Sequence, residues 1–166
     1  MPSGFLIAAL YAALSRPTLA SLAAGLPLAL AGLLLRAWAA GHLAKNQTLT
    51  TSGPFAYTRN PLYAGSLAAA AGFALAGRSW WPAVVFAVYF LLVYWPAIGE
   101  EESHLRQLFP EYAAYAARVP RLLPRVRAES AAGAPFRFSL YLRNREYQAL
   151  AAGLAAAALL LLKLPR

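Results

Sequence analysis

The chain has 166 residues, of which 60% are hydrophobic and only 13% charged, and its mean hydropathy is +0.50. A soluble domain averages about 25% charged residues, so this composition excludes a soluble enzyme, a disordered tail and a disulfide-linked secreted module. With no cysteine, the chain has no thiol nucleophile and no thiolate metal ligand. The composition therefore predicts one all-α domain, a bundle of helices that crosses a membrane several times.

Five apolar blocks follow one another along the sequence, and we interpret each as a membrane helix. They run over residues 3–14, 19–40, 62–76, 80–98 and 147–164. The first and third blocks are close to or below the lower limit of about 17 residues for a span. The first block is a weak candidate for a signal peptide because its first arginine, Arg16, follows the apolar stretch instead of preceding it. About five spans are expected.

The basic residues are unevenly distributed between the two sides that five spans would create. The net charge is +9, from 15 Lys and Arg against six acidic residues, all of them Glu. Eleven of the basic residues fall in residues 36–60 and 99–146, and the other four are Arg16, Arg78, Lys163 and Arg166. Because cytoplasmic segments are enriched in Lys and Arg, both long polar segments are predicted to face the cytoplasm. The third and fourth blocks form a hairpin, so these segments should meet at one face.

The first polar segment, residues 51–65, begins with a turn at Gly53-Pro54. Pro61 is suited to the first turn of a helix, and Asn60 before it is a candidate helix cap. The helix N-terminus with Arg59 beside it would attract an anion. The same residues also fit a simpler interpretation, a turn, a cap and an arginine at a membrane entry without any ligand.

The second polar segment contains three consecutive carboxylates, Glu100, Glu101 and Glu102, directly after the fourth block. They are expected at the C-terminal end of that helix, where the helix dipole favours cations, so a positive partner should lie nearby. Beyond them an apolar stripe at spacings of three and four predicts an amphipathic cytoplasmic helix, which Pro110 divides in two. The stripe consists of Leu105, Leu108, Tyr112, Tyr115 and Val119. A surface helix whose Glu and Arg side chains pair with one another is the alternative.

Both segments resemble signatures of one family. Residues 53–65 share the Gly-Pro-aromatic start, the Arg-Asn-Pro centre and the Tyr-Ala-Gly end of the first signature. Residues 101–124 share the Glu-Glu start and the Val-Pro-Arg-Leu-Leu-Pro end of the second signature. The family is that of the integral-membrane methyltransferases, which includes isoprenylcysteine carboxyl methyltransferase and the phospholipid N-methyltransferases. The resemblance covers about residues 33–124 of the single domain 1–166, and 147–164 would be an additional C-terminal helix.

The resemblance implies an enzyme that uses S-adenosylmethionine and takes a lipophilic or lipidated substrate from the bilayer. It implies Arg59 and Glu101 as catalytic residues, Arg59 as the clamp of an acidic group and Glu101 or Glu102 as the anchor of the cofactor. The cofactor would be held by Tyr57, Arg59, Asn60, Pro61, Tyr63, Glu101 and Glu102, with the two tyrosines as pocket walls. Membrane lipids are expected partners, whereas a metal, a nucleic acid and an obligate protein partner are not.

Position 60 departs from the commonest pattern of the family, which has His there. An Asn side chain does not act as a base near neutral pH, so we assign Asn60 no proton transfer. The acceptor stays open between an isoprenylcysteine-like carboxylate and a phospholipid-like amine. Two other classes compete with the methyltransferase: a membrane reductase that uses NADPH on a lipid or sterol-like substrate, and a membrane scaffold without catalysis.

Overall fold

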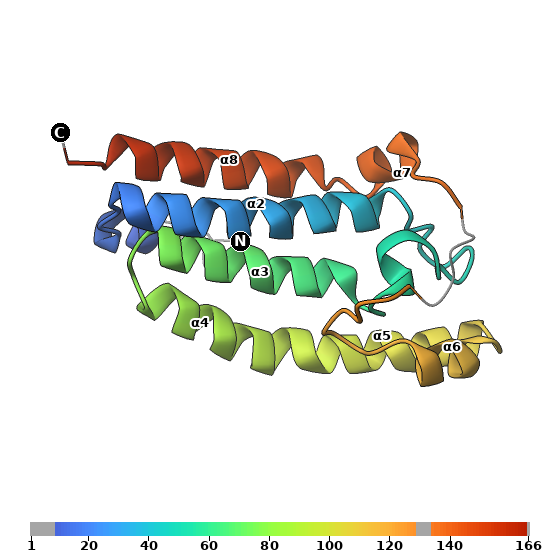
Figure 1. Cartoon of the computed structure of the whole chain (residues 1–166). Helices are drawn as coiled ribbons and strands as arrows, with labels where there is room; N and C mark the ends of the chain where they lie inside the picture. The colour runs from blue at the N-terminus through green and yellow to red at the C-terminus, as the bar shows by residue number, and fades with distance from the viewer. Residues whose placement is uncertain (1–8, 129–133, 166) are drawn as a thin grey trace.

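The computed structural model describes residues 9–128 and 134–165, and every regular element in these ranges is a helix. Helices α2, α3, α4 and α8 lie side by side along one common direction (Figure 1). The prediction of an all-α bundle is therefore confirmed for the described residues. The chain reverses between successive long helices, which places the functional segments at one end of the bundle.

Helices α2 (Leu19–Ala40) and α3 (Pro61–Ala76) form an antiparallel pair whose backbones touch. Helix α2 begins at a capping box, in which the Thr18 hydroxyl accepts from the Ser21 N–H and the Ser21 hydroxyl accepts from the Thr18 N–H. At Gly32 an added Cβ would lie 2.4 Å from the Ala69 nitrogen, so only glycine allows this approach. Close backbone contact through small residues is typical of helix pairs in membranes.

The fourth helical region is longer than predicted. Helix α4 (Trp81–Tyr89), a π-helical turn η2 (Phe90–Tyr94) and α5 (Trp95–Leu108) form one continuous helix of 28 residues. The expectation that Glu100–Glu102 lie at a helix C-terminus is wrong, because the helix continues past them to Leu108. Charged residues such as Glu and Arg are good helix formers, and the helix ends only before Pro110. The predicted break at Pro110 is confirmed, since α6 (Tyr112–Arg118) starts beyond it.

The C-terminal part of the chain returns to α2. Helix α7 (Phe138–Arg143) is followed by α8 (Tyr147–Leu162), which packs along α2. Arg36 of α2 forms a bidentate ion pair with Glu146, with N–O distances of 2.5 and 3.0 Å. The Asn144 amide donates to the carbonyls of Ala40 (2.9 Å) and Leu43 (3.0 Å), which closes the end of α2. These contacts connect α8 to the rest of the bundle.

Within residues 9–128 and 134–165, two helices are long and apolar enough to cross a membrane, α2 and the continuous helix 81–108. Helices α3 and α8 are apolar but have only 16 residues each. At about 1.5 Å per residue each spans about 24 Å, less than a typical hydrocarbon core of about 30 Å. In the first block residues 9–14 are helical, and residues 3–8 lie outside the described ranges. Five spans and their sidedness stay predictions.

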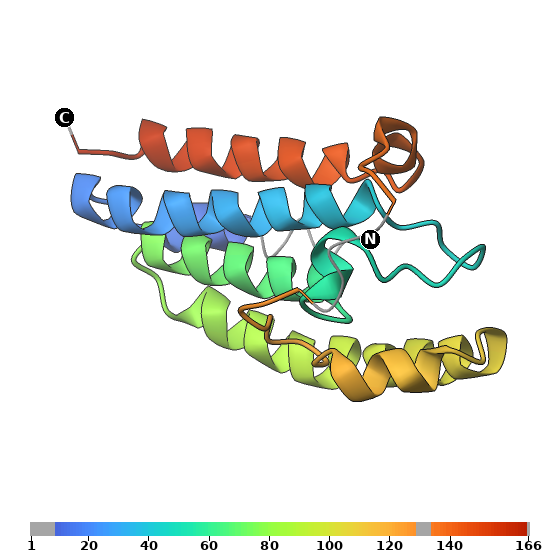
Figure 2. The same ribbon diagram turned by 45° about the vertical axis from the view of Figure 1, so that its right-hand side comes forward.

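The two ends of the bundle differ in what they contain. One end, here called the motif end, holds residues 41–60 and 99–128, which come together as the predicted hairpin requires (Figure 1). The loop before the 3₁₀ turn η1 (Gly53–Ala56) projects from this end (Figure 2). The other end, here called the opposite end, holds residues 15–18, the α3–α4 turn at residues 77–80 and the end of α8. The functional motifs therefore lie together at the motif end.

Candidate functional site

The buried carboxylate of Glu102 lies at the centre of the motif end. Only 7% of this residue is exposed. One oxygen lies 3.2 Å from the Arg59 guanidinium, and the other accepts from Arg121 at 3.0 and 3.2 Å. Asn60 approaches the first oxygen through its amide at 3.5 Å. Buried charges are stable only when such donors surround them, so the expected positive partners of the carboxylate run are present at Glu102. We call these four residues the Glu102 network.

Asn60 precedes α3 at the N-cap position, as predicted, but its side chain forms no capping hydrogen bond. The expectation that the Asn60 side chain caps the helix is therefore wrong. Its amide donates instead to the carbonyl of Arg121 at 2.9 Å. Pro61, at the first helical position, has no N–H for the Asn60 side chain to cap. The Arg121 carbonyl, in contrast, needs a hydrogen-bond donor, which the Asn60 amide supplies. Asn60 thus connects the first signature to the second.

The segment after α6 runs alongside the first signature through further hydrogen bonds. Thr58 is 1% exposed, and its hydroxyl donates to the Leu122 carbonyl at 3.0 Å. The Arg59 N–H donates to the Pro120 carbonyl at 2.9 Å. Neither Thr58 nor Arg121 was predicted as a site residue. The only sequence signal for them was their membership of the two signatures, since their partners lie far away along the chain.

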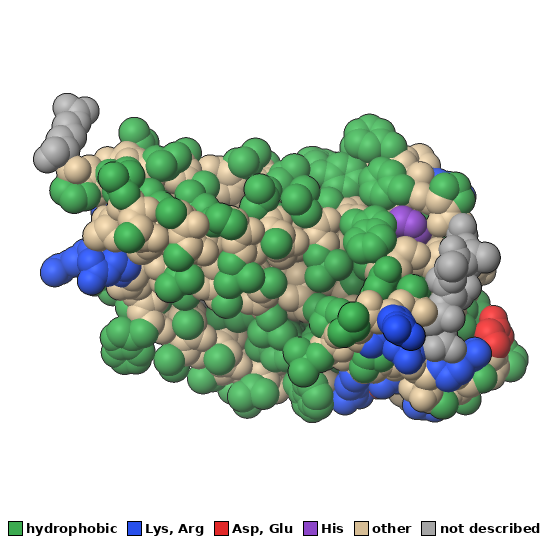
Figure 3. All heavy atoms as spheres, in the orientation of Figure 1, with side chains coloured by type: hydrophobic (Ala, Val, Ile, Leu, Met, Phe, Trp, Pro, Cys, Tyr) green, Lys and Arg blue, Asp and Glu red, His purple; other side chains and the backbone are tan. Residues whose placement is uncertain are grey.

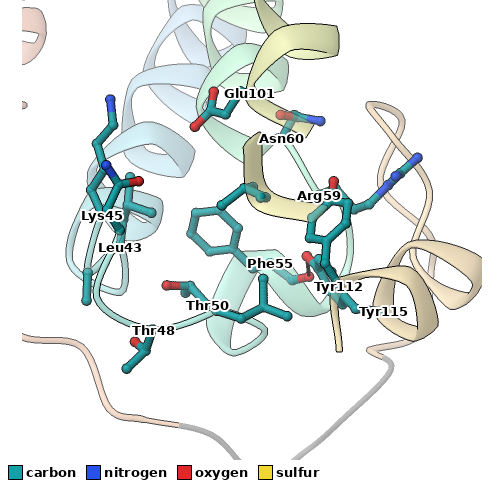
Figure 4. Close-up of a pocket in the computed structure, with 14 residues that line it drawn as sticks. Leu43, Lys45, Thr48, Thr50, Phe55, Arg59, Asn60, Glu101, Tyr112 and Tyr115 are labelled. Carbon is teal, nitrogen blue, oxygen red and sulfur yellow. Dashed lines mark hydrogen bonds between the residues drawn. The ribbon is translucent and has the colours of Figure 1, made fainter. Parts of the chain in front are cut away.

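A small cavity of about 50 Å³ lies beside the Glu102 network (Figure 4). Residues of both signatures line it, and the loop after α2 closes it from one side. In Figure 4, Lys45 of that loop lies on one side of the cavity, and Tyr112 and Tyr115 of α6 lie on the other. Glu101 lines the cavity, whereas Glu102 does not. The two adjacent carboxylates therefore have different surroundings.

Arg59 has a hydrogen-bonding group that the network leaves unused. Its Nε is buried and has no partner among the described residues, although its terminal nitrogen pairs with Glu102. A buried donor without a partner costs about 1–3 kcal/mol. Arg59 and Glu101, which both line the cavity, offer it a donor and a carboxylate. This pair is suited to a ligand that carries both an acidic and a cationic group.

Helix α6 forms the wall of the cavity opposite the loop. The Tyr115 hydroxyl donates to the Phe55 carbonyl at 2.7 Å, which fixes η1 against α6. Burial raises the pKa of the Tyr115 hydroxyl above its ordinary value, and it raises the pKa of Tyr112 as well. Four residues of the predicted apolar stripe pack in one cluster: Leu105, Tyr112, Tyr115 and Val119. The fifth, Leu108, is 42% exposed and lies outside it.

The remaining predicted residues, two tyrosines and a proline, differ in where they lie. Tyr57 packs against Trp38, with ring centroids 6.3 Å apart, and lines a separate apolar depression of about 270 Å³. Tyr63 packs edge-on against Tyr94 at 5.2 Å, and its hydroxyl donates to the carboxylate of Glu101. Pro61 is buried as the first residue of α3. The structure therefore brings Arg59, Asn60, Glu101 and Glu102 together and places Tyr63 in contact with Glu101, whereas Tyr57 lies apart from this cavity.

Comparisons with known proteins identify relatives of this chain. A family model described as "Phospholipid methyltransferase" matches residues 20–112, more than half of the chain. The "Cobalt-zinc-cadmium resistance protein CzcN" of Cupriavidus metallidurans is 39% identical over 93 residues, which are 55% of this chain and 43% of that protein. The "Nickel-cobalt-cadmium resistance protein NccN" of Alcaligenes xylosoxydans xylosoxydans is 35% identical over 94 residues, 55% of this chain and 44% of that protein.

The alignment thus spans less than half the length of either curated relative. No solved structure matches the chain. Within the described part of the chain, no group of three or more His, Cys, Asp or Glu side chains is placed to hold a metal ion. The matched region includes α2 from its second residue, α3 and the whole helix 81–108, and it contains Arg59, Asn60, Glu101 and Glu102.

Proposed function

Because the chain belongs to the phospholipid methyltransferase family of integral-membrane methyltransferases, we propose that it transfers a methyl group from S-adenosylmethionine to a lipophilic acceptor. The observation that carries this proposal is the Glu102 network. It holds Arg59 beside a cavity with one buried N–H unpaired, and it leaves Glu101 at the same cavity. A buried donor and a carboxylate around one cavity suit the amino-acid end of this cofactor.

The chemistry of these two residues fits that end of the cofactor. Its methionine part carries an ammonium group and a carboxylate group. Glu101 would accept from the ammonium, and the Arg59 Nε would donate to the carboxylate, both as charge-assisted hydrogen bonds. Glu102 would not contact the cofactor, because Arg59 and Arg121 already occupy its oxygens. Of the two candidate anchors, Glu101 is therefore the one that we propose.

The size of the cavity limits how much of the cofactor it holds. Sites for ligands of this size have volumes of about 300–1,000 Å³, whereas this cavity has about 50 Å³. It admits the amino-acid end alone. We infer that the loop of residues 43–50, which projects from the motif end, moves away from Phe55 and Tyr115 when the nucleoside end binds (Figure 2).

When bound, S-adenosylmethionine supplies an electrophilic methyl group on a sulfonium. Asn60 transfers no proton in this proposal, because its amide holds the Arg121 carbonyl. The role of the chain is to position the cofactor and to exclude water. Arg59 and Glu101 orient the amino-acid end, and α6 covers the cavity. The acceptor, a carboxylate or an amine on a lipophilic molecule, would come from the bilayer.

A transfer assay with isotopically labelled S-adenosylmethionine and a membrane lipid extract tests the proposal. We expect labelled product in the organic phase with the wild-type chain and at least a tenfold loss with Glu101→Gln. His104→Gln, an exposed position on the same helix, is the matched control and should keep wild-type activity. Binding of NADPH in place of the cofactor product S-adenosylhomocysteine would favour the membrane reductase, and binding of neither would favour the scaffold.

A further inference from the structure

The opposite end of the bundle carries a second cluster of charged side chains. Arg16, Arg78 and Lys163 line one surface depression of about 490 Å³, and none of its described lining residues is acidic. On the face shown in Figure 3, Lys and Arg side chains gather at the two ends of the molecule, and an acidic side chain is visible only at the motif end. The positive charge of this depression is therefore not neutralised by a carboxylate side chain that lines it.

Arg78 has a backbone conformation that its side chain does not favour. It lies in the turn between α3 and α4 with φ of +49°, in the left-handed region where glycine is the preferred residue. Its N–H donates to the Leu75 carbonyl at 3.1 Å, a bond that any residue with this backbone would form. The turn therefore has no need of an arginine.

Backbone contacts hold the other two cations beside Arg78. The Arg16 N–H donates to the Gly77 carbonyl at 2.9 Å, so Arg16 lies next to the same turn. The Lys163 ammonium donates to the carbonyls of Ala12 and Ala13, at the end of the helix that contains residues 9–14. Carbonyl groups orient the ammonium without neutralising its charge. The three cations are thus arranged by the fold around one depression.

An apolar groove continues from this depression. Thr18 and Arg78 line both, and the groove of about 820 Å³ then passes along small and apolar residues of α2 and α3. Trp80 lines it as well and is 78% exposed. Exposed Trp side chains are typical of the interface between lipid head groups and acyl chains. A cationic depression joined to an apolar groove has the two halves that an anionic lipid requires.

We propose that the opposite end binds one anionic phospholipid, with its phosphate group among Arg16, Arg78 and Lys163 and an acyl chain in the groove between α2 and α3. Anionic head groups attract clustered Lys and Arg side chains at a membrane surface. The site lies at the far end of the bundle from the cavity at Arg59. Lipid binding there is independent of the proposed methyl transfer.

Native mass spectrometry of the purified chain in detergent, with added phosphatidylglycerol or phosphatidylcholine, tests this proposal. The test variant is Arg78→Gly, which removes the cation and keeps a backbone conformation that glycine favours. Its matched control is Arg145→Gly, because Arg145 is an exposed arginine with φ of +56° at the motif end. Far-ultraviolet circular dichroism and the thermal unfolding midpoint in detergent should be the same in both variants and in the wild type, which shows that they fold whether or not the chain binds S-adenosylhomocysteine.

We expect the wild-type chain to retain phosphatidylglycerol in preference to phosphatidylcholine. Arg78→Gly should lower the apparent affinity for phosphatidylglycerol at least fivefold, whereas Arg145→Gly should leave it unchanged. Equal retention of the two lipids, or equal losses in the two variants, would overturn the proposal. Binding of inorganic phosphate without retention of phosphatidylglycerol would show a site for free anions and would also overturn it.

Discussion

The Glu102 carboxylate lies 3.2 Å from the Arg59 guanidinium, although the two residues belong to different helical regions, one inside α5 and one just before α3. Arg121 binds the other carboxylate oxygen at 3.0 Å. One buried negative charge therefore holds two arginines from two separate signatures. Because the helix continues past the carboxylate run, Glu102 reaches Arg59 from within α5.

Removal of the Glu102 carboxylate should destabilise the fold. Glu102→Ala leaves Arg59 and Arg121 without their common partner, and the loss of one member of a buried ion pair costs about 3–5 kcal/mol. Denaturant unfolding in detergent micelles measures this cost. Glu100→Ala is the control, because Glu100 is exposed on the same helix and should change the stability by less than about 0.5 kcal/mol. Equal effects of the two variants would contradict the central role of Glu102.

The ion pair between Arg36 and Glu146 should connect α8 to the bundle. The single variant Arg36→Glu places two carboxylates together and removes the contacts of Arg36 with Ser66 and the Leu62 carbonyl. We expect it to destabilise the fold by about 3 kcal/mol or more. The double variant Arg36→Glu with Glu146→Arg restores opposite charges and should recover part of the loss. Thermal unfolding checks both, and a double variant no more stable than the single one would contradict the pairing.

The contact between α2 and α3 should not tolerate even one added methyl group at its centre. Gly32→Ala would place a Cβ 2.4 Å from the Ala69 nitrogen and 2.5 Å from the Gly65 carbonyl oxygen, so the helices must separate. Overpacking of this kind costs about 1–3 kcal/mol. Gly99→Ala is the matched control, since its Cβ would meet only the Arg121 guanidinium at 3.8 Å and would favour the helix. In detergent, the unfolding midpoint of Gly32→Ala should therefore fall, and that of Gly99→Ala should rise.

Tyr115 should be among the last tyrosines of the chain to ionise. Its hydroxyl donates to the Phe55 carbonyl, and burial raises its pKa above the ordinary value of about 10. Because the folded-state pKa is raised, the stabilisation from this hydroxyl is complete below pH 10 and is lost as the pH rises further. Alkaline titration of tyrosinate absorbance should show a late step that Tyr115→Phe removes. The same late step in Tyr115→Phe would show that another tyrosine produces it.

Much of the architecture was predictable because it depends on local patterns. Apolar runs bounded by Pro or Gly mark α2, α3 and α8, and the hairpin of the third and fourth blocks brings the two signatures to one end. A second helix beyond the carboxylates was predicted, but its continuity with the membrane helix through Glu100–Glu102 was missed, because hydrophobicity ends at Ile98 while helix propensity does not. A hydrophobic pattern marks where apolar side chains stop, and not where the hydrogen bonds of a helix stop.

The division of roles within the site was not predictable. Adjacent residues of a helix point in directions about 100° apart, so of Glu101 and Glu102 one faces the cavity and the other the arginines. Which one does so depends on how α5 packs, and a single sequence does not contain that information. Tyr57 shows the same limit, since it shares a motif with Arg59 but faces Trp38.

The most direct test of the central claim is calorimetric titration of the purified chain with S-adenosylhomocysteine, in wild type, Glu101→Gln and Glu100→Gln. Glu101 lines the cavity and Glu100 is exposed beside it on the same helix, so the two variants remove the same charge from neighbouring positions. We expect the wild type and Glu100→Gln to bind equally and Glu101→Gln to bind at least tenfold more weakly, a loss of about 1.4 kcal/mol. Wild-type affinity in Glu101→Gln, or no binding by the wild-type chain, would contradict the account.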